Sequence, residues 1–147
     1  MEELFELKNY IEQGHYPEAM LLIQEMEEMS LDDKINKIRS FTIILLLHLI
    51  KKEAEKRCTR SWEFSIRNSI REITYINKRR KAGGFYLKES DIKAIISEAW
   101  QSALERASFE AFEGRYDEDK LAEMIDEDEI KKDALKMISD EQKNKSI

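Results

Sequence analysis

Residues 41–50, FTIILLLHLI, constrain the fold of this chain more than any other segment. Nine of these ten residues are apolar or threonine, and the exception is His48. A helix that is hydrophobic on every side has to be surrounded by other elements of the protein. We therefore expect a long helix, over about 31–57, at the centre of the fold.

The composition favours helices along the whole chain. Its 147 residues include one proline and four glycines, 38% are charged, and good helix formers such as Leu, Glu and Lys are frequent. No segment shows the alternating pattern of a strand. The sequence predicts an all-α, single-domain bundle of six or seven helices around a long apolar central helix, at about 3–13, 17–28, 31–57, 61–81, 90–114, 117–125 and 129–139.

Local signals predict where these helices begin and end. Gly14 stops the first helix, and Pro17 fits the first turn of the second, where its missing N–H costs nothing. Ser30 is a suitable N-cap for the third helix, as are Ser61 and Asp117 for later ones. Because the second and third helices would be joined by a short connection, we expect them to be antiparallel neighbours.

The cysteine content and the hydropathy indicate the compartment. Cys58 is the only cysteine, so no internal disulfide can form and a reducing environment is expected. The N-terminal residues are acidic and lack the apolar region of a signal peptide. The longest apolar run has about half the length that a bilayer span requires. We expect a cytoplasmic protein with no membrane segment.

Charge is distributed unevenly along the chain. Residues 1–50 carry a net charge of −6, residues 51–81 a net charge of +7, and residues 82–147 a net charge of −7. Two interpretations remain open. The acidic arms can pack over the basic segment and offset its charge, or the basic segment can present an anion-binding face.

The basic segment 57–81 contains a stripe of cations that could follow a phosphate backbone. The cations recur at spacings of seven, four and seven residues, close to one face of a helix, with Trp62 and Tyr75 between them; they are Arg60, Arg67, Arg71 and Lys78. Nucleic acid is therefore a candidate partner, although cations at 78–81 also suit a helix C-terminus and the chain is acidic overall. The predicted binding residues are Arg60, Trp62, Arg67 and Arg71.

His48 has a structural and a functional interpretation. A buried imidazole needs hydrogen-bond partners, because an unsatisfied polar group costs about 1–3 kcal/mol. His48 is either bonded within the core or is a candidate catalytic residue. In antiparallel helices, Glu25 would lie about 20 Å from His48 along the axis, so the turn at Arg60 and Trp62 offers closer partners.

Glu25 and Glu28 are candidate metal ligands. Their carboxylates are spaced three residues apart on one helix face and suit a divalent cation such as Mg²⁺. Asp126 and Asp128 form a second acidic pair. Such pairs are also typical of solvated helix faces. No other cofactor is predicted.

Four blocks of the sequence resemble the domain of unknown function 29 family. They are LLIQEMEEMSLDDKINKIRSFTIILLLHLIKK, which contains His48 and Lys51, RSWEFSIRNSIREI with Trp62, AWQSALERASFEAF with Glu110, and YDEDKLAEMIDED. The resemblance covers about residues 15–128 and leaves a C-terminal helix and a frayed tail at 129–147. Ile70 and Leu104 stand where the family often has arginine. The resemblance implies a compact helical domain with no settled biochemical role.

Two functions follow as hypotheses. The first is an interaction or regulatory module without catalysis, which binds a protein partner or a second copy of itself through the basic helix or the turn at 83–87. The alternative is a metal-dependent hydrolase or nuclease acting on nucleic-acid phosphates, with His48 as a catalytic residue and Glu25 and Glu28 as metal ligands.

Overall fold

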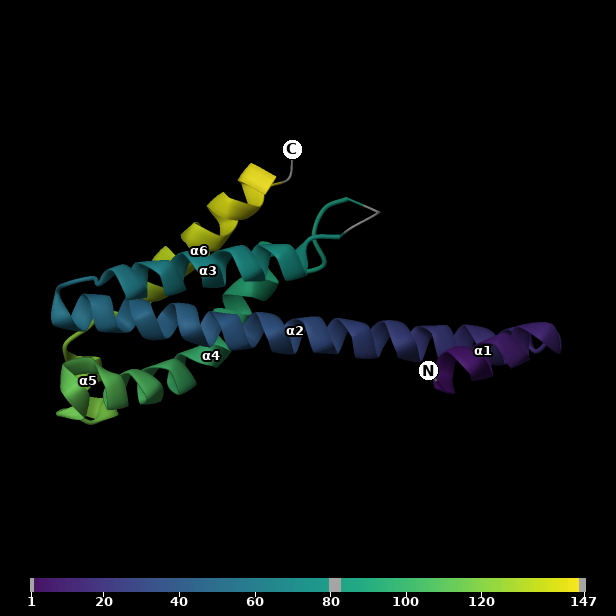
Figure 1. Ribbon diagram of the computed structural model, residues 1–147, viewed down its shortest axis with the longest axis horizontal. Helices are drawn as coiled ribbons and strands as arrows, with labels where there is room; N and C mark the ends of the chain where they lie inside the picture. The colour runs from purple at the N-terminus through teal and green to yellow at the C-terminus, as the bar shows by residue number, and fades with distance from the viewer. Residues whose placement is uncertain (1, 80–82, 146–147) are drawn as a thin grey trace. The chain divides into compact units, whose positions relative to one another are not determined.

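The structure, a computed structural model, describes residues 2–79 and 83–145. The helices are α1 (Glu2–Glu12), α2 (Tyr16–Glu55), α3 (Arg60–Asn77), α4 (Glu89–Glu110), α5 (Glu118–Glu123) and α6 (Glu127–Lys145), with a 3-10 turn η1 (Ala111–Gly114) (Figure 1). The predicted all-α fold is confirmed, since the described residues contain one isolated β-bridge and no strand. None of the helices in this described part is long and apolar enough to cross a membrane.

The chain divides into two compact units, residues 1–36 and residues 37–147. We call them the first unit and the second unit. The prediction of one domain over residues 1–147 stays a prediction.

The first unit consists of α1 and the beginning of α2. α1 ends at Glu12, and Gly14 terminates it as predicted, in the left-handed conformation with a φ of +76°. The N–H of His15 donates to the carbonyl of Tyr10 at 2.8 Å, and the N–H of Gly14 donates to that of Ile11 at 3.1 Å. These two bonds form a Schellman cap, which satisfies carbonyls that the end of a helix leaves open. Pro17 follows in the first turn of α2, as expected.

α2 is one helix of 40 residues where the sequence predicted two. The expected start of a helix at Ser30 is wrong, and the antiparallel pair of helices is absent. No glycine or proline interrupts residues 18–55. Serine inside a helix costs only about 0.5 kcal/mol relative to alanine, so one capping residue without a breaker does not end a helix.

Within α2, burial is concentrated in the second unit. Ile38, Leu45, Leu46 and Ile50 are fully buried, whereas in the first unit Ala19 is the one buried residue among those described. Thr42 is also buried, and its hydroxyl donates to the carbonyl of Ile38 at 2.7 Å. The expected apolar central helix is therefore not confirmed for α2 as a whole.

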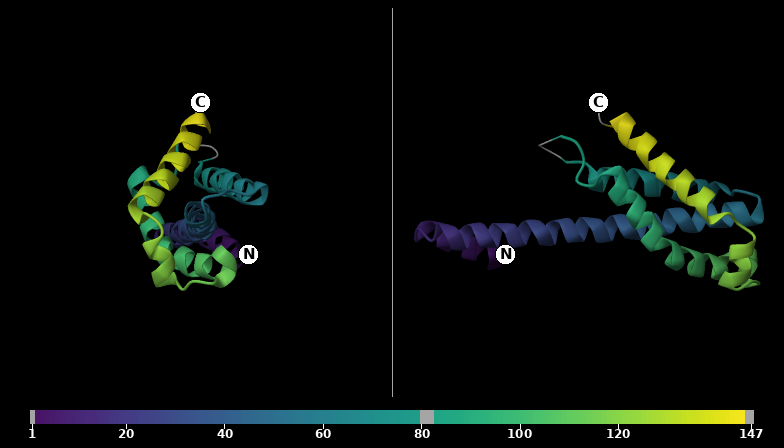
Figure 2. Two further views of the ribbon diagram at one scale, coloured as in Figure 1. Left: turned by 90° about the vertical axis from the view of Figure 1, so that its left-hand side faces the viewer. Right: turned by 180° about the vertical axis from the view of Figure 1, so that it is seen from behind.

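The core of the second unit is built by α3, α4, α5 and α6 around residues 38–51 of α2. Figure 2 shows this part of α2 end-on, with α3, α4 and α6 around it. α4 buries an apolar stripe along its full length, formed by Ile92, Ile95, Ile96, Ala99, Trp100, Ala103 and Ala107. The other helices contribute apolar side chains to the same core, among them Ile66 and Ile73 of α3, Leu121 of α5, and Ile130, Ala134 and Ile138 of α6.

Several helix ends differ from the predicted ones. The N-cap of α3 is Thr59 rather than Ser61, and its side chain accepts the N–H of Trp62 at 3.1 Å. Asp117 caps α5 as predicted and accepts the N–H of Lys120 at 2.9 Å. α6 continues to Lys145, beyond the predicted end at 139. The prediction that α3 extends to residue 81 is wrong, because α3 ends at Asn77; residue 81 itself lies outside the described residues.

Asn77 holds the turn between α3 and α4. Its side chain is fully buried and accepts the N–H of Leu87 at 2.8 Å. The amide nitrogen donates to the carbonyl of Leu87 at 3.3 Å and to the side-chain oxygen of Gln142 at 2.9 Å. One buried amide thus joins the end of α3 to the start of α4 and to α6, and all its bonding groups have partners.

Candidate functional site

Lys51 lies in the interior where α2 meets the end of α4. The residue is 6% exposed, and its ammonium lies 2.9 Å from a carboxylate oxygen of Glu110. The same ammonium lies 4.6 Å from the ring centroid of Trp62. The carboxylate and the aromatic face replace part of the hydration that the buried ammonium of Lys51 loses.

Trp62 binds a second cation on the solvent side. The guanidinium of Arg57 lies 4.9 Å from the ring centroid and 3.0 Å from a carboxylate oxygen of Glu55. The other oxygen of Glu55 accepts the N–H of Phe112 at 3.4 Å. We call Lys51, Arg57, Trp62, Glu110 and Glu55 the Lys51 cluster. It ties the beginning of α3 to the ends of α2 and α4.

His48 lies one helical turn before Lys51 and is half-buried. Burial of the imidazole lowers the pKa of His48 below its ordinary value, and the charge of Lys51 lowers it further. Arg106 acts in the same direction, and Glu110 opposes it. The Nδ1 atom is buried and has no hydrogen-bond partner among the described residues. His48 therefore lies within electrostatic reach of the Lys51 cluster, and its catalytic role stays a prediction.

A left-handed backbone turn follows Glu110. Phe112 and Glu113 have φ values of 52° and 57°, a conformation that costs about 1–2 kcal/mol per non-glycine residue. Gly114 continues the turn at a φ of +77°, where a Cβ would lie 3.1 Å from the carbonyl oxygen of Phe109. The bond from Phe112 to Glu55 and an edge-on contact between the rings of Phe112 and Tyr116 hold the turn in place.

The predicted binding residues of α3 do not form one site, because Trp62 lies in the Lys51 cluster and the three arginines lie elsewhere along the helix. Trp62 belongs to the Lys51 cluster, whereas Arg60 is exposed at the first residue of the helix. Arg67 is exposed and pairs with Glu63 of the same helix at 2.6 Å. Arg71 faces α6 across a groove. The predicted stripe is thus partly neutralised by local carboxylates, and nucleic-acid binding stays a prediction.

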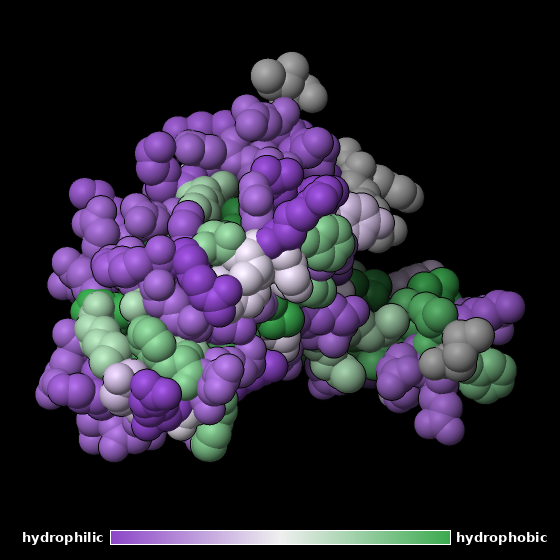
Figure 3. Space-filling view, turned by 60° about the vertical axis from the view of Figure 1, so that its left-hand side comes forward, coloured by the Kyte–Doolittle hydropathy of each residue, from purple (hydrophilic) through white to green (hydrophobic). Residues whose placement is uncertain are grey.

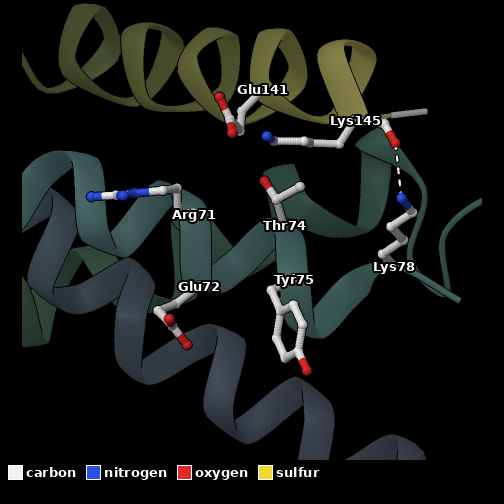
Figure 4. Close-up of a pocket in the computed structure, with 7 residues that line it drawn as sticks. All are labelled: Arg71, Glu72, Thr74, Tyr75, Lys78, Glu141 and Lys145. Carbon is white, nitrogen blue, oxygen red and sulfur yellow. Dashed lines mark hydrogen bonds between the residues drawn. The ribbon is translucent and has the colours of Figure 1, made fainter. Parts of the chain in front are cut away.

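The groove between α3 and α6 contains two adjoining hollows. The first has a volume of about 320 Å³, and its lining includes Arg71, Thr74 and Lys78 of α3 together with Glu141 and Lys145 of α6 (Figure 4). The second, of about 410 Å³, shares Arg71 and Glu141 and extends to Arg67 and Asp140. We call them together the α3–α6 groove.

The predicted metal ligands Glu25 and Glu28 are exposed residues of α2 in the first unit. Asp126 acts as a structural residue, because its carboxylate accepts the N–H of Glu129 at the start of α6. Among the described residues, no group of three or more His, Cys, Asp or Glu side chains is placed to hold a metal ion. Metal binding by Glu25 and Glu28 stays a prediction.

The first unit presents apolar side chains that its own helices do not cover. Of the residues that the structure describes, eight large hydrophobic ones in this unit are exposed, against four in the much longer second unit. Figure 3 shows one face of the molecule, with hydrophobic residues (green) at the surface among hydrophilic ones (purple). The eight residues are Leu4, Phe5 and Ile11 on α1, and Tyr16, Met20, Leu21, Met29 and Leu31 on α2. We call them the first-unit apolar face.

Sequence comparison assigns most of the chain to one family. Residues 18–123 match the family described as "Domain of unknown function DUF29". No curated protein and no solved structure matches the chain.

Proposed function

The chain belongs to the DUF29 family, whose description names no activity, and we propose that it acts without catalysis as an interaction module. In this proposal the first unit binds an amphipathic helix of a partner protein, and that helix carries lysine and arginine beside its apolar residues. The observation that carries the proposal is the first-unit apolar face.

The exposure of this face is unusual for a folded unit. Phe5 is 69% exposed, Met29 64% and Leu21 62%. Covering a side chain of this size gains about 1.5–3 kcal/mol. Exposed apolar residues that lie next to one another, as on one side of a helix, commonly mark an interaction site. The three methionines in this part of α2 also suit a surface that adapts to its partner, because their side chains are flexible.

The spacing of these residues fits a helical partner. Leu4 and Ile11 are seven residues apart on α1, and Tyr16 and Met20 are four apart on α2. Each pair therefore lies along one side of its helix. Rows of this kind are the surface on which an amphipathic helix places residues at i, i+3, i+4 and i+7.

Charge selects the partner. The first unit contains ten acidic and two basic residues, a net charge of −8. A basic amphipathic helix would be attracted to this unit, whereas the same face of a second copy would be repelled by its own charge. This favours a basic partner protein over self-association through the first unit.

Fluorescence anisotropy with the full chain tests the proposal. The probes are three labelled peptides: a leucine–lysine amphipathic helix, a leucine–glutamate helix of the same pattern, and a scrambled leucine–lysine peptide. We expect the basic amphipathic helix to bind at least about tenfold more tightly than the other two. Equal affinities, or no binding, would contradict the proposal.

Two matched variants locate the binding surface. Phe5→Ser removes an apolar residue that is 69% exposed in the first unit, and Phe109→Ser removes one that is 75% exposed in the second. Only Phe5→Ser should weaken binding of the basic helix. A dimer in sedimentation velocity that Phe5→Ser dissociates would instead identify a second copy of the chain as the occupant, against the proposal.

A further inference from the structure

The first hollow of the α3–α6 groove contains a buried hydroxyl without a partner. Thr74 is 3% exposed, and its Oγ1 atom makes no hydrogen bond in the part of the chain that the structure describes. A buried polar group in this state lowers stability unless a ligand or water completes it. The hydroxyl lies on the lining of the hollow, facing α6 (Figure 4).

Charged groups of both signs surround this hydroxyl. Figure 4 shows the side chain of Lys145 extending along α6 so that its ammonium ends near Glu141, above Thr74, whereas the guanidinium of Arg71 points away from Thr74. Among the described residues, neither Glu141 nor the ammonium of Lys145 forms an ion pair. The ammonium of Lys78 is already used, since it donates to the main-chain carbonyl of Lys145 at 3.0 Å.

From this arrangement we infer that the hollow is a binding site for a small zwitterion, a molecule of the amino-acid class. The ligand's carboxylate is held by the ammonium of Lys145 and the hydroxyl of Thr74. Its ammonium group is held by the carboxylate of Glu141. Both ligand charges are then matched, and the buried hydroxyl of Thr74 gains its missing partner.

Ligands with a single charge fit less well. A simple anion would lie beside the carboxylate of Glu141 and near the C-terminal ends of α3 and α6, which carry partial negative charge. A simple cation would lie beside the ammonium of Lys145. The volume of about 320 Å³ is at the lower end of the range for small-molecule sites, which also favours a compact ligand.

This site is independent of the proposed docking function, because α3 and α6 both belong to the second unit. The test is ligand-observed NMR on the full chain with the twenty standard amino acids, followed by calorimetric titration of those that bind. We expect at least one to bind with a Kd of about 1 mM or below. Its deaminated and decarboxylated analogues should bind at least about tenfold more weakly.

Variants place the ligand in the hollow. Glu141→Gln and Lys145→Gln should each weaken binding about tenfold or more, and Thr74→Val about threefold or more, as expected for the loss of one hydrogen bond. The matched controls on α6 are Glu129→Gln and Lys132→Gln, which lie outside the hollow and should leave the Kd unchanged.

Three results would overturn the inference. The first is the absence of binding by every amino acid at concentrations up to about 20 mM, well above the expected Kd. The second is equal affinity for an amino acid and its singly charged analogues. The third is binding that the three hollow variants do not alter.

Discussion

Leu21 and Leu46 lie on the same helix in opposite surroundings. Leu21, in the first unit, is 62% exposed, and Leu46, in the second unit, is fully buried. Both units are helical, and both contain amphipathic segments. Among the described residues, the second unit covers most of its large apolar side chains and leaves four exposed, whereas the much shorter first unit leaves eight exposed. The difference shows that the apolar core lies in the second unit, and the exposed residues of the first unit are the basis of the proposed docking function.

The largest expected difference is between alanine substitutions at these two leucines. Leu46→Ala should lower the free energy of unfolding by about 2–5 kcal/mol, because it leaves a cavity in the core. Leu21→Ala should change it by no more than about 0.5 kcal/mol, as expected of an exposed site. Urea denaturation followed by circular dichroism measures both. Similar losses in the two variants would mean that Leu21 is covered in solution.

Removing the carboxylate of the buried Lys51–Glu110 pair should lower the free energy of unfolding more than removing the carboxylate of an exposed pair. Glu110→Ala leaves the ammonium of Lys51 buried without its carboxylate, and we expect a loss of about 1–3 kcal/mol in the free energy of unfolding. Glu53→Ala is the control, since its pair with Lys56 is exposed and should contribute less than about 1 kcal/mol. Lys51→Met should be tolerated better than Glu110→Ala, because methionine fills the same space without a charge.

The unpartnered hydroxyl of Thr74 predicts a stabilising substitution. Thr74→Val keeps the shape of the side chain and removes a buried polar group, so in the absence of ligand it should raise the free energy of unfolding by about 1 kcal/mol. Chemical denaturation gives the value. A loss of stability would show that the hydroxyl has a bonding partner in solution.

A change in pH should have a smaller effect on the free energy of unfolding. Because the pKa of His48 is lowered in the folded protein, the unfolded chain binds more protons in the window just below the ordinary histidine pKa of about 6.5. This contribution to stability is present above that window and is lost as the pH falls through it. His48→Leu should flatten the dependence between about pH 7 and 5 relative to the matched variant His15→Leu, in which an exposed histidine is replaced. An unchanged slope in His48→Leu would contradict the assigned environment of His48.

The proposal of a non-catalytic module predicts no nuclease activity. Labelled DNA and RNA incubated with the protein and Mg²⁺ or Mn²⁺ should remain uncut, and Glu25→Ala and His48→Ala should behave as the unaltered protein does. Metal-dependent cleavage that both substitutions abolish would replace the interaction module with the hydrolase hypothesis. Salt-sensitive binding of DNA or RNA without cleavage would support the predicted cation stripe of α3 as a nucleic-acid-binding surface.

The sequence predicted the features that depend on periodicity and on local turn chemistry. The helix expected at about 90–114 is present as α4, and Gly14 and Asp117 end and cap their helices as expected. These residues act through neighbours within a few positions, so their pattern is visible in one sequence. The same reasoning failed at Ser30, because a capping residue also fits inside a helix that has no breaker.

Long-range pairs could not be predicted in this way. Lys51 and Glu110 are 59 residues apart, and Asn77 and Gln142 are 65 apart. Their contacts depend on how the helices pack, which no local pattern encodes. The family resemblance identified the sequence blocks that contain Lys51, Trp62 and Glu110. Only the structure shows that these three residues lie together in one cluster. The exposure of the first unit was also missed, because Leu4 and Ile11 have the spacing of core residues.

Hydrogen exchange read by mass spectrometry, with and without the basic amphipathic peptide, would decide whether the first unit is the docking element. Amides covered by a bound partner, or ordered by it, exchange more slowly. We predict that the peptide slows exchange in residues 2–36 and leaves α3, α4 and α6 unchanged. Slower exchange confined to residues 60–145, or no change in residues 2–36 at a saturating peptide concentration, would contradict the proposed docking surface.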